Sequence, residues 1–140
     1  MNIIEATRAW LRSSDLIDKD NKFNAGYLGA SATEYSIAST GESHRADILG
    51  NDICSCSLIF SARMPYGSAL KENITAADFF SQLSTWIRNQ NRVHNYPNVT
   101  GYVVTEVTAS NAGIIIQADA NTAKYQIQIK IDLEEVLTNG

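Results

Sequence analysis

The sequence predicts an α+β domain, with a mainly antiparallel sheet and two amphipathic helices packed on one of its faces. The first observation is residues 125–133, in which five apolar and four polar residues alternate without a break. Successive side chains of a strand point to opposite faces, so this segment is a half-buried strand whose apolar face must be covered. The second observation is that residues 3–11 and 79–87 share the apolar spacing i, i+1, i+4, i+7 and i+8, which lines one helical face. Two such helices and the strand face make a two-layer core.

The first third of the chain combines one helix with extended segments. The helix is expected to begin after Asn2, a suitable N-cap residue, and to end near Ser13. The polar, glycine-containing residues 14–32 indicate an extended connection with a short strand. Residues 33–37 alternate as a strand, whereas residues 39–43 have the composition of a loop.

A β-hairpin is predicted in the middle of the chain. Gly50-Asn51 is a plausible tight turn, because both residues tolerate positive φ. Residues 45–49 are expected to form the strand before the turn, and residues 52–63 a long strand after it. The even-numbered residues from Cys54 to Ala62 are apolar, which predicts that this face of the long strand is buried.

The second half of the chain is predicted to be one helix followed by a meander. The helix is expected to start at Thr75, whose spacing to Asp78 resembles a capping box, and to end at residues 89–92. The strands that follow are expected to be joined by short turns into an antiparallel meander. They are residues 102–108, residues 113–118 after a turn at 109–112, and the strand at 125–133.

Length and composition indicate a single soluble domain, residues 1–140, with residues 133–140 as a polar tail or arm. The chain is 44% hydrophobic and 19% charged, a globular balance. The net charge is −4 and the 11 basic residues are scattered, so no sequence-specific nucleic-acid binding is expected. Residues 1–8 do not resemble a signal peptide, and no apolar run is long enough for a membrane span, so no membrane association is expected.

Cys54 and Cys56 are the only cysteines. On a strand they lie on the same face, roughly 6.5–7 Å apart by the strand rise, which is poor geometry for a disulfide. The Cys-x-Cys spacing also differs from the two-residue spacer of common zinc and redox motifs, and no second cysteine pair exists. We therefore expect two buried free thiols, no metal site and no cofactor.

The sequence contains no recognisable catalytic motif. It has no phosphate loop, dinucleotide fingerprint, helical pair of metal-binding histidines or nucleophile elbow. His44 and His94 are the only histidines, and pairing either with a cysteine would require long-range convergence that the sequence does not indicate. Asp78, Glu134 and Glu135 are expected to be solvated. We expect no enzymatic activity and assign no catalytic residue.

Several stretches resemble a family of minor capsid proteins from tailed bacteriophages and prophages. The opening Ala-Thr-Arg-Ala-Trp-Leu-Arg-Ser is the first of them, and the stretches follow the order and spacing of the family over about half of the chain. The matching residues are 6–13, 16–18, 23–24, 27–28, 33–37, 79–92 and 121–128. At residues 41–51 the chain departs from the family, which has a longer hairpin region there.

The resemblance implies a tail-terminator or head–tail joining protein, which is non-enzymatic and consists of a small β-sheet flanked by helices. Such subunits assemble as a ring, here expected to contain six copies. The ring caps the finished tail tube and faces the head connector. The implied partners are therefore other copies of the chain, the tail-tube protein and the head-connector protein. The implied location is the host cytoplasm during assembly and the head–tail junction of the virion afterwards.

A closed ring needs contacts between two different patches of each subunit, which here would come from loops, sheet edges and the polar sheet face. We select residues 41–51 and 64–70, because each combines apolar side chains with Gly and Ser. Tyr66 is the expected anchor, since aromatic residues are enriched at interface centres. The candidate interface residues are Ile48, Leu49, Met64, Tyr66 and Leu70.

Two other functions remain open at the level of the sequence. One is a small enzyme whose site is assembled from the dispersed residues His44, His94 and Asp78, which would require a pocket that gathers them. The other is a monomeric binding or accessory domain that docks a partner peptide on a sheet edge.

Overall fold

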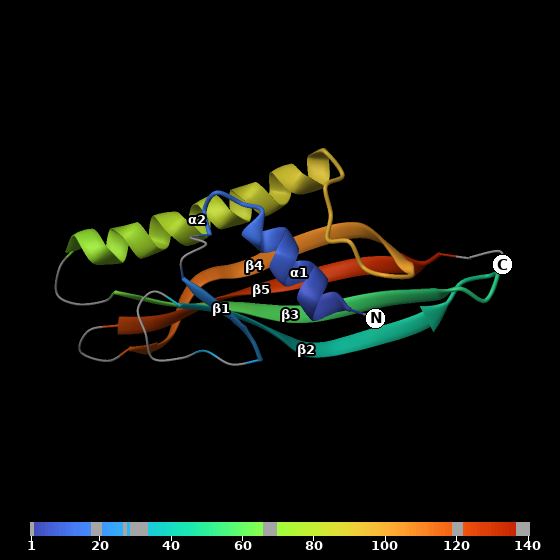
Figure 1. The fold of residues 1–140 in the computed structure, drawn as a ribbon, viewed down its shortest axis with the longest axis horizontal. Helices are drawn as coiled ribbons and strands as arrows, with labels where there is room; N and C mark the ends of the chain where they lie inside the picture. The colour runs from blue at the N-terminus through green and yellow to red at the C-terminus, as the bar shows by residue number, and fades with distance from the viewer. Residues whose placement is uncertain are drawn as a thin grey trace.

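The computed structural model describes residues 2–17, 21–26, 28, 34–65, 70–118 and 122–136, and it has the predicted α+β architecture. Within these described residues, five strands form one open sheet that is covered by two helices (Figure 1). The elements are α1 (Ile3–Arg12), β1 (Lys22–Ala25), β2 (Glu34–Ala46), β3 (Asp52–Pro65), α2 (Leu70–Arg92), β4 (Tyr102–Ala118) and β5 (Thr122–Glu135). The strand order is β1-β2-β3-β5-β4, and only the β1–β2 pair is parallel.

Strand β5 lies between β3 and β4 and shows the predicted alternation. Its odd-numbered residues from Ala123 to Leu133 are all buried. The apolar face of β3 lies beside it in register, with Leu58 opposite Ile129. The two faces therefore form the floor of the core, and a one-residue slip of either strand would turn its apolar side chains to solvent.

Both helices cover this apolar face and contact each other. The ring of Trp10 in α1 lies 4.8 Å from that of Trp86 in α2, measured between centroids. Trp10 Nε1 also donates to the carbonyl oxygen of Asn95 over 2.9 Å. In α2, the ring of Phe80 lies 5.7 Å from that of Tyr125 in β5. One cluster of buried side chains includes residues from both helices and all five strands.

The helix ends differ in part from the predictions. Helix α2 begins at Leu70 rather than at Thr75, so Thr75 and Asp78 lie inside the helix and do not cap it. Asn2 precedes α1 as predicted, but its side chain makes no capping bond. Its Oδ1 instead accepts the N–H of Thr100 over 2.9 Å, which ties the start of α1 to the loop before β4. Neither described helix is both long enough and apolar enough to span a bilayer.

Two segments predicted as a loop and a turn are strand. Residues 39–43 belong to β2, and residues 109–112 belong to β4. Both strands shift their pairing register at these places, between Ser39 and Gly41 in β2 and between Ser110 and Ile114 in β4. The Gly, Ser and Asn residues therefore mark irregularities of the β-bulge kind rather than chain reversals.

The predicted hairpin joins β2 to β3 through a turn at residues 47–51. Asp47 Oδ1 accepts the N–H groups of Leu49 over 2.8 Å and of Asn51 over 2.9 Å. Gly50 has a φ of 86°, a conformation that is accessible to Gly at little cost. The prediction of a hairpin is confirmed, with the turn beginning three residues earlier than expected. Ile48 and Leu49, predicted as strand, lie in this turn.

Candidate functional site

The β2–β3 hairpin reaches beyond both helices (Figure 1). We call its outer part, residues 39–57, the hairpin arm. On the β2 side, all residues from 39 to 46 are exposed. Strand β1 pairs with β2 only over residues 34–37, so within the described ranges no strand pairs with the outer edge of the arm. At the tip, Ile48 is 100% exposed and Leu49 is 76% exposed.

The five candidate interface residues differ in how they are placed in the structure. Ile48 and Leu49 are exposed as expected, but the prediction that Met64 is an exposed contact is wrong. Met64 is 8% exposed, because it continues the buried even-numbered face of β3 into the core. Tyr66 lies outside the described residues, and Leu70 is the first residue of α2, where its side chain is not described.

An irregularity in β2 decides which of its side chains face the cysteines of β3. The register shift at residues 39–41 inserts one extra residue on β2. A bulge of this kind exchanges the faces to which the following side chains point. As a result Glu42 lies opposite Cys56, and His44 lies opposite Cys54.

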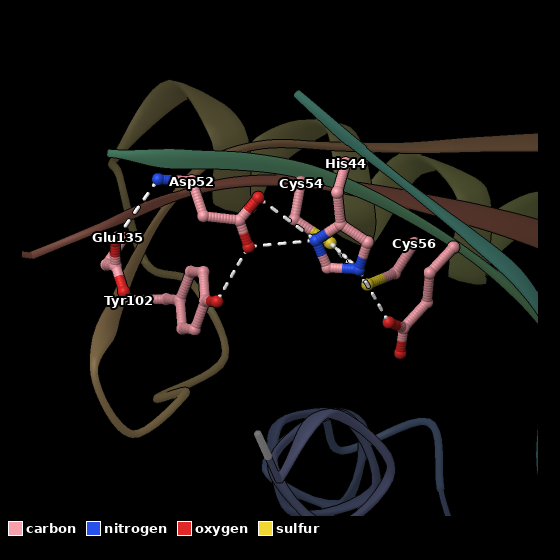
Figure 2. A network of polar contacts seen from close by, with 7 residues as sticks. His44, Asp52, Cys54, Cys56, Tyr102 and Glu135 are labelled. Atoms are coloured by element: carbon pink, nitrogen blue, oxygen red, sulfur yellow. Dashed lines mark hydrogen bonds and ion pairs between the residues drawn. The ribbon is translucent and has the colours of Figure 1, made fainter. Parts of the chain in front are cut away.

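His44 is the centre of a polar network at the base of the hairpin turn. Its Nδ1 lies 2.8 Å from Asp52 Oδ2, and its Nε2 lies 3.0 Å from Glu42 Oε2. The Sγ of Cys54 is 3.7 Å from the same Nε2. Tyr102, at the start of β4, donates to Asp52 Oδ2 over 2.8 Å. Figure 2 shows the imidazole ring between the Asp52 carboxylate and the cysteine sulfurs.

The hydrogen bonds of this network favour an ion pair. Those to Glu42 and then to Asp52 raise the pKa of His44 above its ordinary value. The hydroxyl of Tyr102, followed by His44, lowers the pKa of Asp52. The bond to Asp52 in turn raises the pKa of Tyr102 to about 12. A protonated imidazole therefore donates from both nitrogens to carboxylates at mildly acidic pH.

The two cysteines are buried free thiols, as predicted. Their exposures are 1% for Cys54 and 0% for Cys56, and their Sγ atoms lie 3.4 Å apart. Burial raises the pKa of Cys54, and it raises the pKa of Cys56 to about 12. In space, Cys54 lies next to His44 and His44 lies next to Asp52, which is the arrangement of a nucleophile, a base and an orienting acid. However, a reactive cysteine needs an accessible thiolate, and Cys54 is enclosed with a raised pKa.

The network predicts how stability depends on pH. His44 has a raised pKa in the folded state, so its protonated form stabilises the fold below its ordinary pKa of about 6.5. This contribution is lost as the pH rises through the raised value. We therefore expect wild type to exceed His44→Gln in stability most clearly near pH 6, with a smaller difference near pH 9. Urea unfolding in chelator at the two pH values measures this.

The contribution of Asp52 follows the opposite course. Its pKa is lowered in the folded state, so its contribution is present above its ordinary pKa and is lost as the pH falls through the lowered value.

The control for the His44→Gln comparison is Ser43→Ala on the same strand. We expect the difference in stability between wild type and Ser43→Ala to be the same at both pH values. A wild-type advantage over His44→Gln that grew from pH 6 to pH 9 would contradict the described ion pair.

The other face of the hairpin arm is polar, as the alternation predicted. A broad, open depression of about 900 Å³ involves residues of β2, β3, β4 and β5. Ser55 Oγ donates to Asp132 Oδ1 over 2.8 Å, and Lys130 Nζ lies 4.0 Å from the same oxygen. A polar, lightly charged surface of this kind suits a hydrated contact between subunits.

The structure does not gather the residues of the dispersed enzyme site. Asp78 and His94 are both exposed and are separated by about four turns of helix, or about 20 Å. Neither belongs to the network around His44. That network uses Asp52 and Tyr102 instead, which the sequence analysis missed. The predicted hairpin was the available signal, since a turn near residue 50 brings the flanking residues of two strands side by side.

Comparison with known proteins does not place the chain in a family. No protein-family model matches it, and no curated protein matches its sequence. The function is therefore inferred from the fold, from the resemblance of its residues and from the hairpin arm.

Proposed function

We propose that the protein is a non-enzymatic morphogenesis protein of a tailed bacteriophage, a subunit of a tail-terminator or head–tail joining ring. Two features support the proposal. The stretches that resemble minor capsid proteins imply a small sheet flanked by helices, and the chain has such an α+β fold. The chain also has a projecting hairpin with an apolar tip, which suits a contact between neighbouring subunits.

The exposed tip of the hairpin arm is the observation that carries this proposal. Ile48 is fully exposed and Leu49 lies beside it, whereas most apolar side chains of the hairpin strands are buried. Two adjacent apolar residues at the end of a projecting element are stabilised by burial against a partner, at about 1.5–3 kcal/mol for each side chain that becomes fully buried. Among the described residues, no strand pairs with the β2 edge of the arm, so this edge can accept another strand.

At the opposite edge of the sheet, backbone groups of Thr105 and Val107 on β4 already have side-chain partners, unlike the described outer edge of the arm on β2. On β4, the N–H of Val107 donates to Asn91 Oδ1 over 2.9 Å, and the Asn91 amide donates back to the Val107 carbonyl. Tyr96 donates its hydroxyl to the carbonyl of Thr105 over 3.1 Å. Edge groups that already bond to side chains of α2 and of the loop after it are poor templates for another strand.

A second copy of the chain is the partner that we propose for the hairpin arm. Closed rings use heterologous contacts, in which one patch of a subunit meets a different patch of the next. The apolar tip and open edge form one patch, and the polar sheet face provides a surface of different character for the other. The further partners would be the tail tube and the head connector.

The test removes the apolar tip without disturbing the fold. We expect Ile48→Ser combined with Leu49→Ser to melt like wild type, because both side chains are exposed and the turn is held by Asp47 and by backbone bonds. We expect the concentration needed for assembly to rise by about 10-fold or more, since buried apolar anchors dominate interface energies. Sedimentation velocity over a concentration series measures assembly. Electron microscopy of the protein mixed with tail tubes of its phage measures capping.

The matched control is Val93→Ser, which changes a 70% exposed apolar residue outside the arm and should leave assembly unchanged. A double variant that assembles and caps at wild-type concentrations would contradict the proposed role of the tip. A chain that stays monomeric at all concentrations and caps no tubes, yet binds an extended peptide along β2, would favour the accessory binding domain instead.

A further inference from the structure

Four side chains of types that ligate metals project from two paired strands at the base of the hairpin turn. Glu42 and His44 come from β2, and Cys56 and Cys54 lie opposite them on β3. Residues two apart on one strand share a face, and cross-strand partners are neighbours on that face. The four side chains therefore form a square on the core-side face of the arm, which none of the functions discussed above requires.

Three of the four donor atoms already lie close to one another, and the fourth, Cys56 Sγ, lies beside the sulfur of Cys54. Glu42, His44 and Cys54 each offer one donor atom, and these atoms all lie within 4.8 Å of one another. Typical zinc bond lengths place tetrahedral ligands about 3.4 Å apart for N and O, 3.6 Å for S and N and 3.8 Å for two S atoms. The corresponding separations here are 3.0 Å, 3.7 Å and 3.4 Å, the last between the sulfurs of Cys54 and Cys56.

The surroundings of His44 match the outer shell of a metal site. A histidine that binds a metal through one ring nitrogen commonly donates the other N–H to a carboxylate, which orients the ring. Nδ1 of His44 faces Asp52 at 2.8 Å, which leaves Nε2 on the side of Glu42 and Cys54. Asp52 is itself held, by the hydroxyl of Tyr102 and through its own N–H, which donates to Glu135 Oε1 over 3.1 Å.

We propose that Glu42, His44, Cys54 and Cys56 form a binding site for one divalent transition-metal ion of the zinc class. Two sulfurs, an imidazole and a carboxylate suit Zn²⁺ and would not select Mg²⁺ or Ca²⁺, which prefer oxygen ligands. The ion would displace the two thiol protons and any proton on Nε2, because only the deprotonated groups are ligands.

Access and charge are consistent with metal entry. The side chains of Glu42 and His44 are 36% and 45% exposed, whereas the cysteines are buried behind them. An ion would therefore enter from the solvent side and be closed in by the two β2 ligands. The carboxylates of Asp52 and Asp132 also lie close enough to act on Cys54, so the site has an acidic surround that favours a cation.

A bound ion would clip the two strands of the hairpin arm together below its tip. The two ligands on β2 precede the turn that carries Ile48 and Leu49, and the two ligands on β3 follow it. A cross-link at this place restricts the conformations of the arm, which among the described residues has a strand partner on one edge, through β5. The metal site does not depend on the phage assignment, since it follows from the ligand geometry alone.

The test uses the reduced, chelator-treated full chain titrated with Zn²⁺ or with Co²⁺ as a spectroscopic probe. We expect native mass spectrometry to show one Zn²⁺ per chain and calorimetry to give a Kd below about 1 μM. The Co²⁺ form should show intense tetrahedral d–d bands and thiolate-to-cobalt charge transfer. Zn²⁺ should also raise the melting temperature, because the ion binds the folded state.

The variants separate the site from unspecific binding. His44→Gln and Glu42→Gln change exposed side chains, so they should stay folded while binding is weakened or lost. Cys54→Ser should weaken the charge-transfer band, because Cys56 is then the one remaining thiolate ligand, and Asp52→Asn should weaken binding by about 10–100-fold through its effect on His44. His94→Asn is the matched control, since it removes the other histidine and should leave binding unchanged.

Two results would overturn the proposal. They are no binding by the folded wild type at micromolar Zn²⁺, and equal binding by wild type and His44→Gln.

Discussion

Replacing Ile129 by Asp is expected to unfold the domain. Ile129 is 1% exposed in the middle of β5, with Leu58 of β3 and Ala109 of β4 as cross-strand partners. A buried carboxyl must either stay charged in an apolar environment or become neutral, which at pH 7 requires a pKa shift of about 3 units, or about 4 kcal/mol. Loss of the apolar side chain adds about 2–5 kcal/mol. Together these approach the whole stability of a typical domain, about 5–15 kcal/mol.

Circular dichroism and a thermal melt measure this result, and a neighbouring residue provides the control. Gln128→Asp introduces the same charge one residue away on the exposed face, where we expect a cost of about 1 kcal/mol or less. A cooperative Ile129→Asp variant with wild-type melting behaviour would show that the core face of β5 has been assigned to the wrong side.

Replacing Phe60 by Ala is expected to have the second largest effect on stability. Phe60 is completely buried in β3, and its ring centroid lies 5.6 Å from that of Phe23, 5.7 Å from Tyr35 and 6.3 Å from Phe80. It therefore joins β1, β2 and α2 in one aromatic cluster. Removing a buried Phe ring costs about 3–5 kcal/mol, because neighbouring groups collapse only partly into the space.

The measurement is urea unfolding, with Phe60→Leu as the control that keeps much of the volume. We expect about 1.5 kcal/mol or less for Leu, and a fall of roughly 10 °C in melting temperature for Ala. A cost below about 1 kcal/mol for Phe60→Ala would mean that the cluster repacks, and that its ring contacts are not a main source of stability.

Unbroken periodicity determined the parts of the fold that the sequence analysis predicted. The alternation at residues 125–133 and the even-numbered face of β3 identified the sheet that bears the core. The helical stripes at residues 3–11 and 79–87 identified what covers it. In these segments one apolar face is buried along its whole length, so the pattern leaves a single acceptable register.

Irregular strands were not recognised, because their composition is that of loops. Residues 39–43 and 109–112 are rich in Ser, Gly, Asn and Ala and have little apolar alternation. They are strands because β3 and β5 pair with residues on both sides of each irregularity. Pairing with a neighbour thus overrides weak local preference for a strand.

The sequence by itself determined the fold class, the core faces, the buried thiols and the presence of a hairpin near residue 50. Only the tertiary structure decided that His44 and Glu42 face the cysteines. Continued alternation from the buried residues of β2 would place Ser43 and Arg45 on that face instead. The register shift at residues 39–41 exchanges the two sets. Because the backbone of β2 absorbs one extra residue to keep pairing with β3, no local pattern of side chains records the exchange.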